Sequence, residues 1–261
     1  FGRTYYEGHS VQSVHKSLRE AMLGNSFEYD ISSSVITWKY AFAQDYLNSL
    51  DSSNCVDAEF YGIQYYLSYK SDFYEDVLAQ TFTNESTWSL EKKKKKLKQA
   101  MTAFSFGAKL IEAKWKDANG FDKVSSVMEI LKYADERERF MNCNAVTRFK
   151  HEQEKLDSYI AKTFKERYPF LESLNSLKTL KGYNSRSKLI SWLYQHAETI
   201  MMDIVRDELK TLGKTVLANV HDAIVVRERL TESELLAIQD LVRKRTNVML
   251  FSLSETPYKR H

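Results

Sequence analysis

The sequence contains little that would interrupt regular structure. Only 2 prolines, Pro169 and Pro257, and 8 glycines occur among its 261 residues. Proline and glycine are the residues that most often divide a chain into turns, linkers and many short strands. Their scarcity excludes a linker-rich architecture and favours long helices. We therefore expect a helix-rich α+β fold.

Cysteine and long apolar runs are scarce as well. The 2 cysteines, Cys55 and Cys143, lie far apart and cannot supply a zinc site or a disulfide framework. No apolar run approaches the roughly 20 residues of a membrane-spanning helix, and no signal-peptide pattern opens the chain. We expect a cytoplasmic protein without a membrane partner. Because the chain begins with Phe1, we also expect processing or truncation before it.

Composition permits a sizeable core but does not identify a partner. Hydrophobic residues make up 43% of the chain, enough for one large domain or two small ones. The formal charge of +3 arises from 38 basic and 35 acidic side chains, and it is too small to demonstrate a nucleic-acid partner. Charge has to be examined segment by segment.

The first informative segment contains an aspartate near the end of a short hydrophobic run. Residues 27–31 have strand composition and include Asp30. Ser32, Ser33 and Ser34 follow, and serine is a favourable helix N-cap. The sequence therefore predicts a strand that carries Asp30, followed by a helix that continues through Tyr46.

The second segment predicts an amphipathic helix that carries many lysines. An apolar face at helical spacing comprises Leu97, Ala100, Met101, Phe104 and Ala108. A separate outward stripe, each residue four from the last, comprises Lys94, Lys98, Thr102 and Phe106. The remaining lysines of the run 92–96 are expected on the solvated side of the helix, or in nonspecific contacts with phosphate groups.

The third segment predicts a long helix, a hairpin and a second helix. The helix covers about 187–212, and Gly213 is a plausible C-terminal stop. Strand-like residues 216–220 and 224–226 flank a turn at His221-Asp222-Ala223. Thr231 and Glu234 have the capping-box spacing that starts an amphipathic helix.

Asp30 and Asp222 are suited to one kind of chemistry. If their strands are antiparallel neighbours, both carboxylates lie at the same edge of the sheet. Two carboxylates so placed can hold two Mg²⁺ ions roughly 3.5–4 Å apart, which stabilise the attacking and leaving oxygens of a phosphoryl displacement. The carbonyl of Ile31 can add an oxygen ligand. Lys94 and Lys98 can bind a triphosphate, and Phe106 can stack beside a base.

Three motifs resemble those of the single-subunit RNA polymerases of bacteriophages and mitochondria, and of the related family A DNA polymerases. DISSSVI, 30–36, is similar to motif A, especially its D-x-S-x-S-x-I form in the RNA polymerases. KQAMTAFSFGAK, 98–109, is similar to motif B, and VHDAIVV, 220–226, to motif C. Gly2-Arg3 resembles the pair that precedes motif A. The order of the motifs makes the resemblance more specific than any one of them.

This resemblance implies a right-hand polymerase palm with helical fingers inserted between its two parts. The expected domains are palm 1–43, fingers 44–183 and palm 184–261. Asp30 and Asp222 would bind metal, and Lys98 would contact the triphosphate and donate a proton to pyrophosphate. The nucleotide contacts would include Lys94, Thr102, Phe106 and Val35. The template or product contacts would include Arg3, Gly107, Gln195 and His221.

Two departures from the family pattern leave sugar choice open. Val35 stands where the DNA polymerases usually have glutamate and the RNA polymerases glycine. Phe106 replaces the usual tyrosine of motif B. The serine spacing and the absence of a glutamate after His221-Asp222 favour a DNA-directed RNA polymerase. A family A-like DNA polymerase is the alternative, and a catalytically inactive, nucleic-acid-binding palm is a third possibility.

The expected partners follow from the same resemblance. They are a DNA template, nucleoside triphosphates and a growing RNA or DNA strand. The chain is short for this family, so a further subunit or an N-terminal region is expected to supply the thumb and promoter contacts. A phage or other mobile replicon is the expected source by analogy, which would place the protein in the bacterial cytoplasm.

Overall fold

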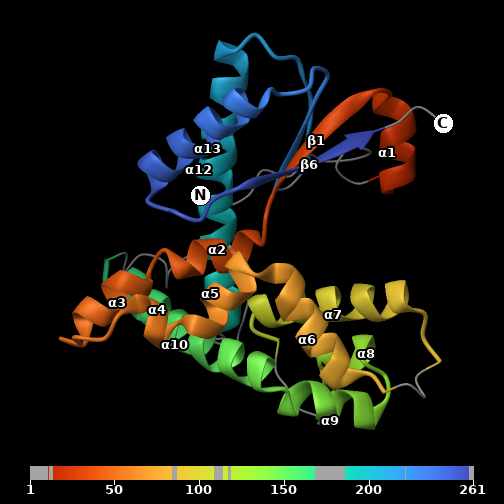
Figure 1. Ribbon diagram of the computed structural model, residues 1–261, viewed down its shortest axis with the longest axis vertical. Helices are drawn as coiled ribbons and strands as arrows, with labels where there is room; N and C mark the ends of the chain where they lie inside the picture. The colour runs from red at the N-terminus through yellow and green to blue at the C-terminus, as the bar shows by residue number, and fades with distance from the viewer. Residues whose placement is uncertain are drawn as a thin grey trace. The chain divides into compact units, whose positions relative to one another are not determined.

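The structure, a computed structural model, describes residues 11, 14–83, 87–108, 114–116, 119–167, 186–220 and 222–258. The chain divides into two compact units. Unit 1 comprises Phe1–Ala41 and Ser191–His261, and unit 2 comprises Phe42–Ile190. Helices dominate, and an antiparallel sheet lies in unit 1 (Figure 1). The predicted helix-rich α+β class is confirmed.

Unit 1 is built on a four-stranded antiparallel sheet with strand order β4-β5-β1-β6. The strands are β1 (Ser26–Ile31), β4 (Val216–Val220), β5 (Ala223–Val226) and β6 (Leu253–Tyr258). The helices are α1 (Lys16–Leu23), α2 (Ser34–Tyr40), most of α12 (Arg186–Thr211), and α13 (Glu232–Thr246). The predicted strand at 27–31, the hairpin and the long helix are all present.

The central strands of this sheet are covered on both faces. Residues Ala223–Val226 of β5 are all buried, although successive side chains of a strand point to opposite faces. On one face, Val225 and Tyr258 pack with Leu23 of α1. On β1, the hydroxyl of Tyr29 donates to Glu255 Oε2 at 2.8 Å and accepts from Leu230 N at 2.9 Å. The hydroxyl of Tyr29 therefore connects β1 both to β6 and to the residue Leu230 that precedes α13.

The two edge strands are irregular. On β4, the pairing with β5 shifts register between Val216 and Ala218, which marks a bulge. On β6, Pro257 lies opposite Phe27 of β1. Proline has no backbone N–H, so it is tolerated in a sheet only where that position faces away from the ladder. β6 itself was not predicted from the sequence, and neither was α1.

The helix ends in unit 1 follow local signals. Thr231 and Glu234 form the predicted capping box at the start of α13. Gly213 follows α12 with φ of 69°, a left-handed conformation that glycine adopts without strain. Lys214 pairs with Glu234 at 2.9 Å, which joins the end of α12 to the start of α13.

The helix predicted after Asp30 differs from the prediction in two ways. α2 begins at Ser34, but its N-cap Ser33 is left-handed and makes no side-chain cap hydrogen bond. The helix also ends at Tyr40 instead of continuing through Tyr46, and α3 begins at Ala43. Phe42, at the break, packs edge-on against Phe164 of unit 2. The chain therefore leaves the core of unit 1 at the point where the periodicity suggested a continuous helix.

Unit 2 is almost entirely helical in its described part. Its first helices are α3 (Ala43–Ser49), α4 (Val56–Glu59), α5 (Tyr61–Ser68) and α6 (Lys70–Thr81). They are followed by α7 (Leu90–Ser105), α8 (Ser126–Ile130), α9 (Ala134–Asn142) and α10 (Asn144–Arg167). A two-stranded ribbon pairs β2 (Trp115–Lys116) with β3 (Asp122–Lys123).

A buried carboxylate joins α5 to α10 in unit 2. Glu152 is 2% exposed and accepts hydrogen bonds from Gly62 N at 3.0 Å and Ile63 N at 2.8 Å. Arg148 Nε pairs with the same carboxylate at 2.8 Å. A β-carbon at Gly62 would lie 3.0 Å from Arg148 Cγ, so the two helices approach closely there. The N–H groups at the start of α5 are satisfied by a side chain of α10.

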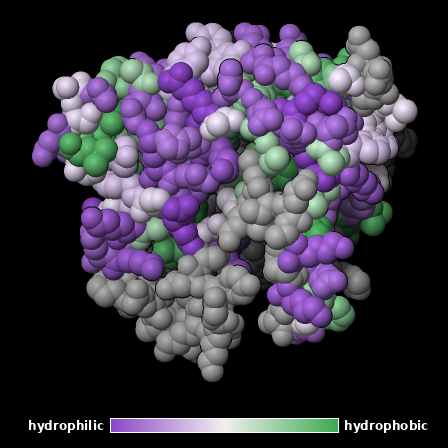
Figure 2. All heavy atoms as spheres, turned by 90° about the horizontal axis from the view of Figure 1, so that it is seen from below, coloured by the Kyte–Doolittle hydropathy of each residue, from purple (hydrophilic) through white to green (hydrophobic). Residues whose placement is uncertain are grey.

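Hydrophilic side chains cover most of the described surface in the view of Figure 2. The large apolar side chains are concentrated in the cores instead. Within the described ranges, no helix has the length and apolar character required to cross a membrane.

Gly107 and Gly213 provide a matched pair for a stability test. Both have positive φ, 80° and 69°, so an alanine at either site should cost about 1–2 kcal/mol of backbone strain. A β-carbon at Gly107 would also lie 2.5 Å from Ser187 Oγ, whereas nothing lies within 4 Å at Gly213. We expect Gly107→Ala to lower the free energy of unfolding by about 1 kcal/mol more than Gly213→Ala, as measured by denaturant titration. Equal losses would contradict the predicted clash.

Candidate functional site

The sheet of unit 1 brings Asp30 and Asp222 to the same end of two adjacent strands. β1 and β5 are antiparallel, and Asp30 is paired with Ala223. One residue further, Ile31 N donates to the carbonyl of Asp222 at 3.1 Å. Asp222 lies in the turn between β4 and β5, whereas Asp30 lies within β1. Residues 192 positions apart in the chain are therefore neighbours across one ladder.

Asp30 lies on a strand that is held from both sides. β1 pairs with β5 on one side and with β6 on the other. The carbonyl of Asp30 accepts a hydrogen bond from Ser254 Oγ at 3.2 Å, and Ser32 N donates to Ser252 O at 2.9 Å. A central strand with two partners has little freedom to move, so the backbone of Asp30 is rigidly placed.

The side chain of Asp222 faces the start of α2. Ser34 Oγ donates to Asp222 Oδ2 at 3.3 Å. Ser34 is the first residue of α2, four positions after Asp30. The segment that follows Asp30 therefore contacts the carboxylate contributed by the hairpin.

A buried tyrosine and a buried glutamate of α12 lie beside this contact, and sequence analysis did not identify them. Tyr194 and Glu198 are each 1% exposed and lie one helical turn apart. Burial raises the pKa of the Tyr194 phenol well above its ordinary value, and the charges of Glu198 and Asp222 raise it further. The phenol therefore stays protonated. One feature of the sequence could have indicated them: Glu198 is a glutamate on the apolar side of the long predicted helix.

The donor atoms at this end of the sheet fit a hard cation. Carboxylate and carbonyl oxygens are the ligands that Mg²⁺ prefers. Asp30 and Asp222 supply carboxylates, and the carbonyl of Ile31 is the predicted third donor. Among the residues that the structure describes, no group of three or more His, Cys, Asp or Glu side chains could hold a metal ion. Any metal here would be held by two carboxylates supplemented by backbone oxygen or water.

The predicted outward stripe of unit 2 lies on α7. Lys94, Lys98 and Thr102 are exposed, and Phe106 is 38% exposed at the C-cap. The opposite face, Leu97, Ala100, Met101 and Phe104, is buried as expected. Ala108 does not belong to it, because the helix ends at Ser105. Gly107, with positive φ, then turns the chain away.

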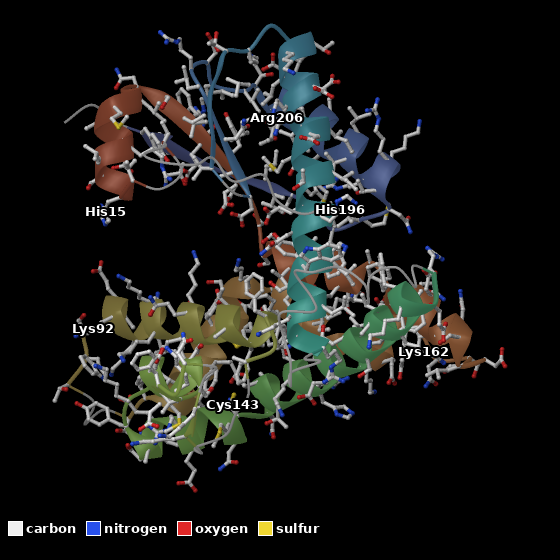
Figure 3. The ribbon with its side chains drawn as sticks, turned by 180° about the vertical axis from the view of Figure 1, so that it is seen from behind. His15, Lys92, Cys143, Lys162, His196 and Arg206 are labelled. Carbon is white, nitrogen blue, oxygen red and sulfur yellow. The ribbon has the colours of Figure 1, made fainter. Side chains whose placement is uncertain are left out.

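The lysine run 92–96 is not uniformly solvated. Lys96 is 8% exposed, its ammonium donates to the carbonyl of Ile130, and it lies 4.6 Å from the centroid of the Trp88 ring. Burial lowers its pKa. Lys92, labelled in Figure 3, lies 3.8 Å from the same ring centroid. The expectation of a solvated Lys96 was wrong, because the helix turns this position toward α8.

The other predicted residues are scattered. Val35 is 4% exposed and belongs to the core of unit 1. Gln195 is partly exposed on α12, and its carbonyl accepts from Thr199 Oγ1. Arg3 and His221 lie outside the described residues.

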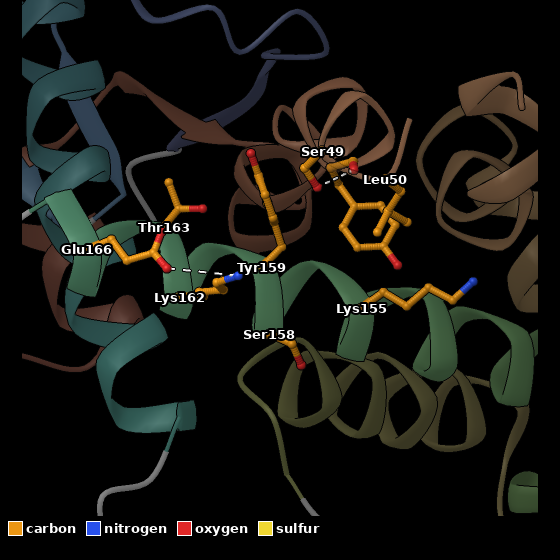
Figure 4. A pocket seen from close by; sticks show the side chains of 9 residues that line it. Ser49, Leu50, Lys155, Ser158, Tyr159, Lys162, Thr163 and Glu166 are labelled. Atoms are coloured by element: carbon orange, nitrogen blue, oxygen red, sulfur yellow. Dashed lines mark hydrogen bonds and ion pairs between the residues drawn. The ribbon is translucent and has the colours of Figure 1, made fainter. Parts of the chain in front are cut away.

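Unit 2 also contains an open cleft of about 680 Å³ between α3 and α10 (Figure 4). It is lined by Tyr46 and Tyr159, whose rings meet edge-on, and by two lysines. Lys155 pairs with Glu59, and Lys162 lies 3.9 Å from Glu166. Because these cations are compensated, the cleft offers no clear preference for an anionic ligand. None of the predicted site residues lines it.

Comparison with known proteins identifies no family. No protein-family model and no curated protein matches the chain. Among solved structures, the chain is similar to the POL domain of Pol1 from M. smegmatis in complex with DNA primer-template and dNTP. The TM-score is 0.46 and the sequence identity 12%, over 90% of this chain and 39% of that one. The chain thus spans about two fifths of the length of that chain.

The two kinds of lysine on α7 should differ in their effect on stability. Lys96→Ala removes a donor from a partly buried carbonyl and a cation from the Trp88 ring, so the free energy of unfolding should fall by about 1–3 kcal/mol. Lys94→Ala, on the exposed face of the same helix, should change it by less than about 0.5 kcal/mol. Urea unfolding of both variants tests this, and similar small effects would show that Lys96 is not structural.

Proposed function

We propose that this chain is the catalytic core of a template-directed nucleotidyltransferase, and specifically of a DNA-directed RNA polymerase of the single-subunit type. The observation that carries the proposal is the pairing of β1 with β5. It brings together Asp30 and Asp222, the aspartates of the two segments that resemble motifs A and C. Each aspartate taken alone would be unremarkable at a strand end, but their juxtaposition is what phosphoryl transfer requires.

The carboxylates of Asp30 and Asp222, with the carbonyl of Ile31, would hold two Mg²⁺ ions. Bound there, the metal would supply positive charge to the attacking and leaving oxygens. The chain's own contribution is to hold the two carboxylates rigidly. Asp30 is fixed within a central strand, and Asp222 is fixed by the backbone bond from Ile31 N.

The exposed stripe of α7 would contribute the nucleotide contacts. Lys98 would bind the triphosphate and give a proton to the departing pyrophosphate, and Lys94 would bind a second phosphate group. Thr102 and Phe106, one and two turns further on, would lie along the nucleotide and beside the templating pair. The exposure of all four side chains supports this assignment. Arg3, Gly107, Gln195 and His221 are proposed for the template or product.

The division of the chain supports a palm in two parts with inserted fingers. The proposed domains are palm 1–43, fingers 44–183 and palm 184–261. The boundaries of the compact units, after Ala41 and after Ile190, lie 2 and 7 residues from these limits. A thumb and promoter contacts would come from a further subunit or another segment.

A family A-like DNA polymerase is the second candidate because of one residue. Val35 is larger than the glycine of the RNA polymerases that segment 30–36 resembles. It lies five residues after Asp30, at the start of α2, and its side chain is buried. A bulky side chain there could exclude a ribose 2′-hydroxyl. The serine spacing of 30–36 favours the RNA polymerase. A palm that binds nucleic acid without catalysis is the remaining alternative.

Strand extension tests the proposal directly. The full chain would be given a primed or unprimed single-stranded DNA template and Mg²⁺, with ribonucleotides and deoxyribonucleotides offered separately. Asp30→Ala and Asp222→Ala should each reduce extension by at least about 100-fold, because each loses a ligand of the metal whose positive charge would stabilise the reacting phosphate. Asp207→Ala, an exposed aspartate of the same unit, is the matched control and should have no effect. Extension that survives loss of both aspartates would exclude them as the catalytic pair.

Val35→Gly tests the sugar assignment. Removing the side chain should raise the ratio of ribonucleotide to deoxyribonucleotide incorporation, because it vacates the position proposed to face the 2′-carbon. The ratio is the appropriate measurement, since a glycine in α2 also lowers stability and would reduce both rates together. Val35→Ala should give an intermediate ratio. An unchanged ratio in both variants would remove Val35 from the sugar-selecting position.

A further inference from the structure

Asp222 lies in a turn, and a turn alone does not fix the direction of its carboxylate. The backbone of Asp222 is held through its carbonyl, which accepts from Ile31 N at 3.1 Å. The side-chain torsions need a separate contact. Among the described residues, such a contact is the bond from Ser34 Oγ to Asp222 Oδ2, at 3.3 Å.

Ser34 is well placed to orient another side chain because the helix that carries it is anchored. Val35, Ile36 and Trp38 of α2 are at most 4% exposed. The helix cap does not use the Ser34 hydroxyl: the N-cap residue is Ser33, and it makes no side-chain cap bond. The hydroxyl of Ser34 is directed at the hairpin carboxylate instead.

Tyr194 adds a second anchored group at the same place. Its ring lies 5.9 Å from that of Trp38, so α12 and α2 pack together there. Its hydroxyl lies near the side chains of Ser34, Glu198 and Asp222. Tyr194 is 1% exposed, so water does not compete for this position.

We propose that Ser34 and Tyr194 are positioning residues for Asp222: Ser34 holds its carboxylate directly, and Tyr194, packed on Trp38, supports Ser34 from α12. The inference rests on the proposed function, since it assigns these residues to the support of a metal ligand. Neither residue touches the reacting atoms. Loss of a residue that orients a metal ligand commonly weakens metal binding by about 10–100-fold.

Metal binding can be measured without catalysis. Mn²⁺ would be titrated into the full chain, and free Mn²⁺ would be followed by its electron paramagnetic resonance signal. Ser34→Ala should weaken Mn²⁺ binding by about tenfold. Ser34→Thr keeps the hydroxyl and should bind nearly as the unmodified chain does. Thermal unfolding of each variant shows whether the fold is retained.

Tyr194→Phe removes only the hydroxyl and keeps the ring contact with Trp38. This substitution should also weaken Mn²⁺ binding severalfold. In the double variant with Ser34→Ala, the affinity for Mn²⁺ should fall by less than the product of the two single effects, because both residues act on one carboxylate. Tyr74→Phe, a partly buried tyrosine of unit 2, is the matched control and should leave Mn²⁺ binding unchanged.

The outcomes separate the two proposals. If the unmodified chain binds Mn²⁺ and Asp222→Ala abolishes binding, the metal site stands. Unaltered binding by Ser34→Ala and Tyr194→Phe would then overturn the positioning role alone, as would Ser34→Thr binding as weakly as Ser34→Ala. If the unmodified chain binds no Mn²⁺, or binds it independently of Asp222, the proposed function fails and the positioning role fails with it.

Discussion

The pairing of β1 on both of its sides is the constraint on which the arrangement of unit 1 depends. β1 is short, yet it is the only element that contacts the hairpin on one side and the C-terminal strand on the other within the described sheet. Its register determines that Asp30 meets Ala223, and hence that Asp222 lies at the end of the same ladder. A slip of one residue would turn Asp30 toward the opposite face of the sheet. The buried side chains of β5 resist such a slip, because a shifted register would disrupt their close packing on both faces of the sheet.

Unit 2 depends on a different principle, the satisfaction of buried polar groups between helices. Glu152 of α10 accepts from the first N–H groups of α5 and pairs with Arg148. Lys96 of α7 caps a carbonyl at the end of α8, and Arg137 of α9 donates to the carbonyl of Leu131. Side chains of one helix thus satisfy the ends of another, which fixes how these helices pack. The exposed stripe of α7 is held in place by this packing.

Local signals predicted well the elements whose ends are determined by a few neighbouring residues. The capping box at Thr231, the glycine stop at Gly213 and the hairpin at Asp222 all have such signals, and all are present. Features that depend on distant residues were missed. The break between α2 and α3 occurs where Phe42 packs against Phe164, and Lys96 is buried by α8, so neither could be inferred from helical periodicity. The adjacency of Asp30 and Asp222 was predicted from strand composition, whereas Tyr194 and Glu198 were not recognised because their neighbours come from other segments.

The edges of the sheet have a consequence for assembly. An exposed edge strand can recruit a strand from another molecule through its free backbone groups. Here the bulge in β4 disturbs the spacing of one edge, and Pro257 removes a donor from the other. Both edges are poor templates for such strand addition, which protects the protein from edge-to-edge aggregation. A protein partner would consequently have to recognise side chains on the helices and loops, since the edges of the described sheet offer no regular ladder to extend.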